Sequence, residues 1–233
     1  MQPLLTKIWW ACVDRASFIE QHLSIVRRPP MSNKPYFAEV VQSSLPFWTA
    51  QSWNWNEVID FATLVIAEEK NRLVFGIVYA IETGSWQNER TPFPYQKTEE
   101  ELLREQPHIF ELLRTNFSCI TVGYKEADQP ITYQYAPQPP KIHRFVRPAT
   151  MQETHDFFAH EHYIALLCAS GSFFNLEELL LGMIQFRIKK GLFTSPHYGE
   201  FINALSLLMG NDYRRLKMFL YRLQPLINSN HPL

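Results

Sequence analysis

The stretch "TYQYAPQPPKIHRFVRPAT", residues 132–150, decides the fold because the character of the chain changes across it. Its four prolines fix the backbone and remove amide donors, which favours an extended path at an edge or surface and excludes a central strand. A flexible linker has no use for the apolar residues Ile142, Phe145 and Val146. We therefore predict that this segment is docked, and that these three side chains anchor the junction between two regions of the chain.

Strand patterns dominate the residues that precede this junction. Short runs of β-branched and aromatic residues are separated by turn residues. The runs are "YFAEVVQSS" (36–44), "FATLVIAEE" (61–69), "RLVFGIVYAIET" (72–83) and "SCITVGY" (118–124). Gly76 and Gly123 lie inside two of them, where glycine indicates a bulge or a close approach of the backbone. Sharp bends of this kind are typical of a small β-barrel.

Helical patterns appear in two places. Thr98 and Glu101 form a capping box before an amphipathic run that Pro107 divides, which predicts a helical insertion in the β module. Thr150 and Glu153 form a second capping box directly after the junction. From there the apolar residues recur at helical spacing, so we expect helices over the remainder of the chain.

The order of these patterns predicts an α+β fold, in which a small N-terminal β-barrel with a helical insertion is followed by a C-terminal helical bundle. We expect the barrel to span residues 35–148 and the helical domain to span residues 149–233. We expect residues 1–34 to be a separate N-terminal extension, because the run "RRPP" directly precedes Met31. This extension is either a helix that docks through Ile8, Trp9 and Trp10 or translated sequence upstream of a start at Met31.

Composition limits the classes of function. The 233 residues are 46% hydrophobic with a net charge of -1, which favours a packed core and gives no overall attraction to nucleic acid or acidic lipid. No run reaches the roughly 18 apolar residues needed to cross a bilayer. The cysteines Cys12, Cys119 and Cys168 are too scattered for a disulfide framework or a CxxC metal site. We therefore expect reduced thiols, a cytoplasmic location and no membrane partner.

Four segments, in their order along the chain, carry a resemblance to a known family. They are "FAEVVQSS" (37–44), "FATLVIAEEKNRLVFGIVYAIETGS" (61–85), "FELLRTNFSCITVGY" (110–124) and "YAPQPPKIHRFVRPAT" (135–150). This order resembles the HAS barrel, which HerA-type ATPases and ATP-synthase subunits share. More closely, the chain is similar to stand-alone proteins in which such a barrel precedes a helical C-terminal region.

The resemblance carries an expectation about function and one clear departure. In the large relatives the barrel precedes a motor domain and helps to assemble a ring. This sequence contains no G-x-x-x-x-G-K-[ST] motif, so the phosphate cradle of a P-loop ATPase is missing. The resemblance therefore implies a barrel without the motor, and it assigns no catalytic residue.

Catalytic and metal-binding chemistry find little support in the sequence. His155, His160, Glu161 and His162 are potential metal ligands, but their spacing does not place the three histidines on one face of a helix. Ordinary surface or loop histidines are the favoured interpretation. The chain also lacks the G-x-S-x-G motif of a nucleophile elbow. We therefore expect neither a cofactor, nor a metal, nor an enzyme.

Two kinds of side chain remain as candidates for binding. One kind is aromatic and would offer a stacking platform, and the other is basic and would contact an acidic partner or RNA. The candidates are Trp53 and Trp55, "RIKK" with Arg187, Lys189 and Lys190, and "RRLK" with Arg214, Arg215 and Lys217. The plainer interpretations are core packing for the tryptophans and solvated helix faces for the charges.

Charge is unevenly distributed along the chain. Residues 35–140 carry 7 Lys or Arg against 14 Asp or Glu, whereas residues 141–233 carry 10 against 7. An acidic barrel repels phosphate backbones. We therefore expect a non-catalytic protein-interaction or assembly module, accessory to a larger complex or a ring ATPase. The alternative is a nucleic-acid-associated accessory protein that binds through its basic C-terminal helices.

Overall fold

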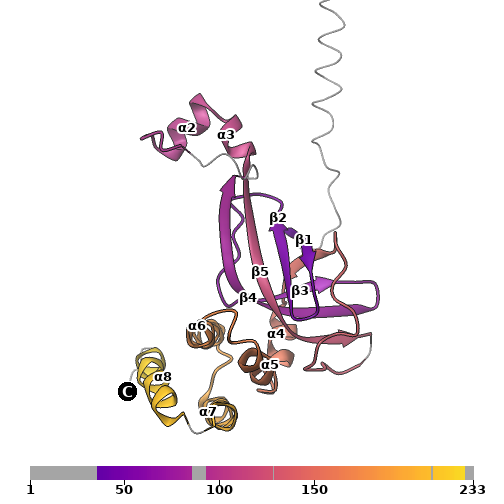
Figure 1. The fold of residues 1–233 in the computed structure, drawn as a ribbon, viewed down its shortest axis with the longest axis vertical. Coiled ribbons are helices and arrows are strands. Elements are labelled where there is room, and N and C mark those ends of the chain that lie inside the picture. The colour runs from indigo at the N-terminus through magenta and orange to yellow at the C-terminus, as the bar shows by residue number, and fades with distance from the viewer. Residues whose placement is uncertain (1–35, 86–92, 128, 211, 229–233) are drawn as a thin grey trace, which may run out of the picture. The chain divides into compact units, whose positions relative to one another are not determined.

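Six antiparallel strands close into a barrel in the order β1-β2-β5-β4-β3-β6 (Figure 1). The computed structural model describes residues 36–85, 93–127, 129–210 and 212–228. The strands are β1 (Ala38–Ser43), β2 (Phe47–Ser52), β3 (Leu64–Glu68), β4 (Arg72–Ser85), β5 (Leu113–Glu126) and β6 (Phe145–Pro148). The predicted barrel is confirmed, while the expected N-terminal extension, residues 1–34, lies outside the described residues.

Alternate residues of the same strand face two different hydrophobic clusters. In β3, Val65 and Ala67 belong to the cluster that fills the barrel, to which all six strands contribute. Leu64 and Ile66 belong to a second cluster, in which strand residues pack against helices. Because both faces of β3 are covered, its sequence is apolar without interruption instead of alternating with polar residues.

Seven helices lie in the described part of the chain. They are α2 (Glu99–Glu105), α3 (His108–Glu111), α4 (Met151–Phe157), α5 (Tyr163–Ala169), α6 (Leu176–Lys189), α7 (Ser195–Met209) and α8 (Tyr213–Asn228). Helices α2 and α3 form the predicted insertion between β4 and β5, and Pro107 separates them. The capping boxes at Thr98 and Thr150 start α2 and α4 as expected. Helices α4 to α8 follow the barrel and pack at its other end from the insertion (Figure 1).

The junction segment closes the barrel, which corrects part of the prediction for it. Strand β6 pairs with β1 on one side and with β3 on the other, so it has neighbours on both edges. The exclusion from a central position was wrong because Pro148 occupies only the last position of the strand, and Phe145 and Val146 keep their amide donors. Val146 is buried, but Ile142 is 47% exposed and does not act as an anchor.

Two glycines allow close approaches that the fold requires. A Cβ on Gly76 would lie 2.4 Å from Cζ2 of Trp48 inside the barrel, so this glycine makes room for the indole. A bulge in the pairing of β4 with β5 lies at the same position, as predicted. A Cβ on Gly182 of α6 would lie 2.9 Å from the Cβ of Ala62. Helix α6 therefore lies directly against the turn that precedes β3.

Strands and helices share one core. The cluster that contains Leu64 and Ile66 also contains Leu180 of α6, Leu205 of α7 and Phe219 of α8. Residues 36–233 form one compact unit. The change from strand to helix between Pro148 and Met151 is therefore a boundary between two layers that pack on each other.

Candidate interaction surface

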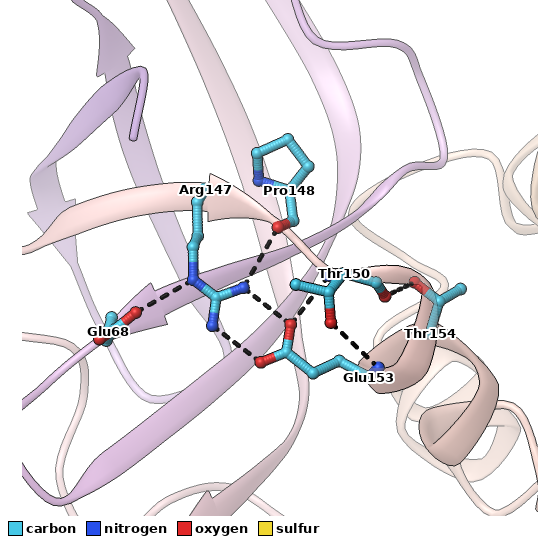
Figure 2. A network of polar contacts seen from close by, with 6 residues as sticks. All are labelled: Glu68, Arg147, Pro148, Thr150, Glu153 and Thr154. Carbon is cyan, nitrogen blue, oxygen red and sulfur yellow. Dashed lines mark hydrogen bonds and ion pairs between the residues drawn. The ribbon is translucent and has the colours of Figure 1, made fainter. Parts of the chain in front are cut away.

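A polar network fixes the start of the helical layer on the barrel (Figure 2). Arg147 of β6 donates from Nε to Oε2 of Glu68 at 3.0 Å. It also donates from Nη1 and Nη2 to the two carboxylate oxygens of Glu153 at 2.7 and 2.8 Å. Glu153 is the third residue of α4 and accepts from the backbone amide of Thr150. One arginine therefore connects β3, β6 and α4.

The charges in this network stabilise one another. Burial alone would raise the pKa of Glu153, but its hydrogen bonds with Arg147 and Thr150 outweigh burial and lower the pKa to about 2. The hydrogen bonds that Arg147 donates to Glu153 and to Glu68 raise the pKa of Arg147, although its partial burial acts in the opposite direction. Because these groups are one another's hydrogen-bond and ion-pair partners, we interpret the network as structural: it holds α4 against the barrel.

Arg187 does not lie on the surface, which corrects its assignment to a basic patch. Its side chain is fully buried, with the guanidinium 4.8 Å from the ring centres of Phe158 and Phe193. Nη2 lies 2.8 Å from Oε1 of Glu161. The hydroxyl of Tyr163 donates to the other oxygen of that carboxylate at 2.5 Å. A charge with this many internal partners is not accessible to a binding partner.

The predicted histidines do not gather around a common point. His155 is exposed on α4 beside Asp156. His160 and His162, in the loop before α5, stack with ring centres 5.4 Å apart. Within the residues that the structure describes, no group of three or more His, Cys, Asp or Glu side chains is arranged to hold a metal ion.

A groove runs between the start of α5 and the outer side of α7, and we name it the α5–α7 groove. Its volume is about 680 Å³. Its polar residues are His160, Glu161, His162, Glu200 and Asn203, and its apolar residues are Ala165, Ala204, Leu207 and Leu208. Leu207 is 83% exposed. An apolar side chain at this exposure is available to a partner.

The outer side of α8 carries a second exposed set, which we name the α8 face. It consists of Tyr213, Arg214, Lys217, Met218 and Tyr221, all of which are exposed. The exposed fractions of Tyr213, Met218 and Tyr221 are 72%, 59% and 74%. The opposite side of the helix carries Phe219 and Leu223, which are buried in the core. The helix is therefore apolar inward and aromatic, apolar and basic outward.

The remaining basic candidates are divided among different environments. Arg215 pairs with Glu177 of α6, so only Arg214 and Lys217 of "RRLK" belong to the α8 face. Lys189 and Lys190 line a separate pocket of about 480 Å³ beside Asp60 and Phe186. The eight residues predicted for binding thus do not form one surface.

The tryptophan candidates directly follow β2 of the barrel and are half-buried. Trp53 donates from Nε1 to Glu39 at 3.0 Å and meets the ring of Phe145 edge-on. Trp55 stacks on Phe110 of the helical insertion, with ring centres 5.3 Å apart. Their contacts agree with the packing interpretation that the sequence offered beside the binding one.

Comparisons with known proteins do not assign the chain to a family. A scan against protein-family models matches none of them, and a search of curated proteins returns no match.

In the part of the chain that the structure describes, no helix combines the length and apolarity needed to span a bilayer.

Proposed function

We propose that this protein is a non-catalytic interaction module that assembles with other proteins through the exposed side chains of α7 and α8. The observation that carries the proposal is the exposure of Leu207, Tyr213 and Tyr221, at 83%, 72% and 74%. Tyrosine, arginine and methionine, which the α8 face carries, are enriched where the energy of protein–protein binding concentrates. The HAS-barrel resemblance supports an accessory role in a larger complex or ring ATPase.

The rest of the unit fits the role of a rigid support. Side chains from all six strands fill the barrel, including the large ones of Trp48 and Phe117. The helices share their core with the strands, so α7 and α8 are held firmly. The free thiols Cys119 and Cys168 support a cytoplasmic location.

A nucleic-acid-associated role is the weaker proposal. Arg187 is buried and Arg215 and Arg222 pair with glutamates, which removes three cations from the basic helices. Phosphate binding depends on the number of such cations. Two remaining cations on the α8 face suit a protein contact better than a nucleic-acid backbone.

Affinity purification with matched variants tests the proposal. We expect tagged wild-type protein to capture a partner that the double variant Leu207→Asp/Tyr221→Asp loses. The control Leu103→Asp makes the same change at a 47% exposed leucine of α2 and should keep the partner. Thermal melting of all three proteins checks that they are folded.

Two results would contradict the proposal. One is a partner retained equally by both variants, which would place the contact elsewhere. The other is captured material that nuclease treatment removes, which would favour the nucleic-acid role.

A further inference from the structure

We propose that a partner of the α8 face is a second copy of this chain, whose α5–α7 groove receives it. This inference rests on the proposed function, since it names the occupant of the same helical surface. It follows from the complementary charge, and the shared apolar character, of two surfaces that each copy carries.

The groove has the features of an acceptor. Its two alanines, Ala165 and Ala204, are small side chains that let another helix approach closely, and Leu207 and Leu208 supply apolar contact. Amphipathic helices bind in apolar grooves through side chains spaced three, four and seven positions apart. The groove volume of about 680 Å³ is large enough for several such side chains.

The groove carries an uncompensated negative charge. Glu161 is neutralised by Arg187 beneath it, through the 2.8 Å ion pair. Glu200 is exposed at the groove, and no ion pair to it is found among the described residues. An occupant that places a cation beside apolar side chains would therefore match the groove.

The α8 face has this chemistry. Arg214, Lys217, Met218 and Tyr221 follow one another at the spacing that places them on one side of a helix. Neither Arg214 nor Lys217 has an ion-pair partner among the residues that the structure describes, whereas Arg215 and Arg222 are occupied by Glu177 and Glu178. Two free cations therefore flank apolar side chains.

The two surfaces cannot meet within one molecule. No residue of α8 lines the groove of the same copy, and Lys217 and Tyr221 of the α8 face line a different pocket, beside Tyr198 of α7. A contact between the face and the groove therefore joins different copies of the chain. Each copy offers one face and one groove.

Sedimentation velocity of the full chain over a concentration series tests the inference. We expect the mass to rise above that of the monomer with increasing concentration, and to fall again in high salt, which screens exposed charges. Glu200→Lys and Lys217→Glu should each weaken self-association by roughly tenfold, the scale of a lost or reversed charge contact. The double variant should regain association, because the charge pair is restored with reversed sign.

The control is Glu100→Lys, which makes the same charge change on α2 and should leave association unchanged. A chain that stays monomeric at every concentration would overturn the inference, as would single reversals without effect or a double variant that is not restored. Partner capture that depends on Leu207 and Tyr221 would still uphold the proposed function in that case, so the two failures are distinguishable.

Discussion

Arg147 and Arg187 show how two arginines of similar chemistry acquire different roles from their surroundings. Arg147 retains partial exposure, with 10% of its side chain accessible, and binds two carboxylates. Arg187 has none of its side chain accessible and pairs with one carboxylate and a tyrosine hydroxyl. Removing a partner should therefore cost more at Arg187, because a fully buried charge would be left uncompensated.

Glu161→Gln is the substitution that tests this cost. We expect it to lower the free energy of unfolding by about 3–5 kcal/mol, the range for breaking a buried pair. Chemical denaturation measures the change. Glu178→Gln is the control, because Glu178 pairs with Arg222 at a site where both side chains are nearly half exposed. The control should cost at most about 1 kcal/mol.

Replacing both Glu161 and Arg187 separates the effect of the buried charges on stability from the effect of side-chain packing. Glu161→Leu/Arg187→Met removes both charges and should recover most of the lost stability, since apolar side chains of similar size often replace buried ion pairs without cost. If the double variant is as unstable as Glu161→Gln, the geometry of the pair matters more than its desolvation.

The pKa of Glu153 predicts an acid-dependent loss of stability. Because folding lowers this pKa from 4.5 to about 2, the carboxylate contributes its full stability above pH 4.5 and loses it as the pH falls towards 2. Glu153→Gln keeps a capping side chain but has no such titration. The difference in unfolding free energy between wild type and variant should therefore shrink through this window.

Urea unfolding at a series of pH values measures that difference. Glu101→Gln is the matched control, because Glu101 occupies the same capping position in α2 and its pKa is lowered by bonds with Thr98 rather than by an arginine. A difference for Glu153→Gln that stays constant with pH would show that Arg147 does not depend on the ionised carboxylate.

The sequence alone carries a signal for the buried position of Arg187 but none for the pairing of Glu161. Arg187 follows Met183 and Ile184 by four and three positions, so helical phase places it on the buried side of α6. That signal was present, but the neighbouring lysines suggested a surface run. Glu161 carried no such signal, because its partner lies 26 residues away in the chain.

Among the helices and strands, the sequence predicted where α2 and α4 begin more reliably than it predicted the strands of the barrel. Capping boxes at Thr98 and Thr150 satisfy the first free amides of a helix, so the sequence marks those starts directly. Strand β2 is only six residues long and lies between turns, and β6 is four residues long beside prolines. Strand β6 pairs only with the distant strands β1 and β3, and β2 pairs with the distant β5 as well as with its neighbour β1, so part of the barrel depends on contacts that no local pattern encodes.

The contact of α6 with the barrel makes opposite predictions for two helical glycines. A Cβ at Gly182 would lie 2.9 Å from Ala62, so Gly182→Ala should lower the free energy of unfolding by about 1–3 kcal/mol through overpacking. Nothing lies within 4 Å of a Cβ at Gly199 of α7. Gly199→Ala should therefore raise stability by roughly 0.5–1 kcal/mol through helix propensity.

Chemical denaturation of the two variants measures both effects. Equal gains for the two would mean that α6 can move away from Ala62 without cost, and that the close packing of helix on barrel contributes little.

At the scale of the whole molecule, the shared core predicts a single unfolding transition for residues 36–233. Leu64 and Ile66 of the barrel pack in one cluster with Leu180 and Phe219 of the helices, so neither layer keeps its core without the other. Tryptophan fluorescence of a chain that begins at residue 36 reports mainly on the barrel, which contains Trp48, Trp53 and Trp55, and far-ultraviolet circular dichroism follows the helices. We expect the two signals to change at the same denaturant concentration.

Trypsin provides an independent check. Lys141 is exposed beside the strand that closes the barrel. Cleavage there should be slow under native conditions, because the protease needs the segment to open. Rapid cleavage into two stable fragments, or helices that melt before the fluorescence changes, would show that the layers are independent domains.

The position of β6 as the strand that closes the barrel has a consequence for folding during synthesis on the ribosome. The barrel stays open until Val146 has left the exit tunnel, because that residue pairs with both Ala38 and Ala67. The outer face of β3 stays bare for longer, until Leu180 and Phe219 have been synthesised. Nascent chains of intermediate length therefore display an apolar strand surface and unpaired strand edges, the features that lead to aggregation. The barrel and the helical layer can complete their shared core only once Phe219 has been synthesised.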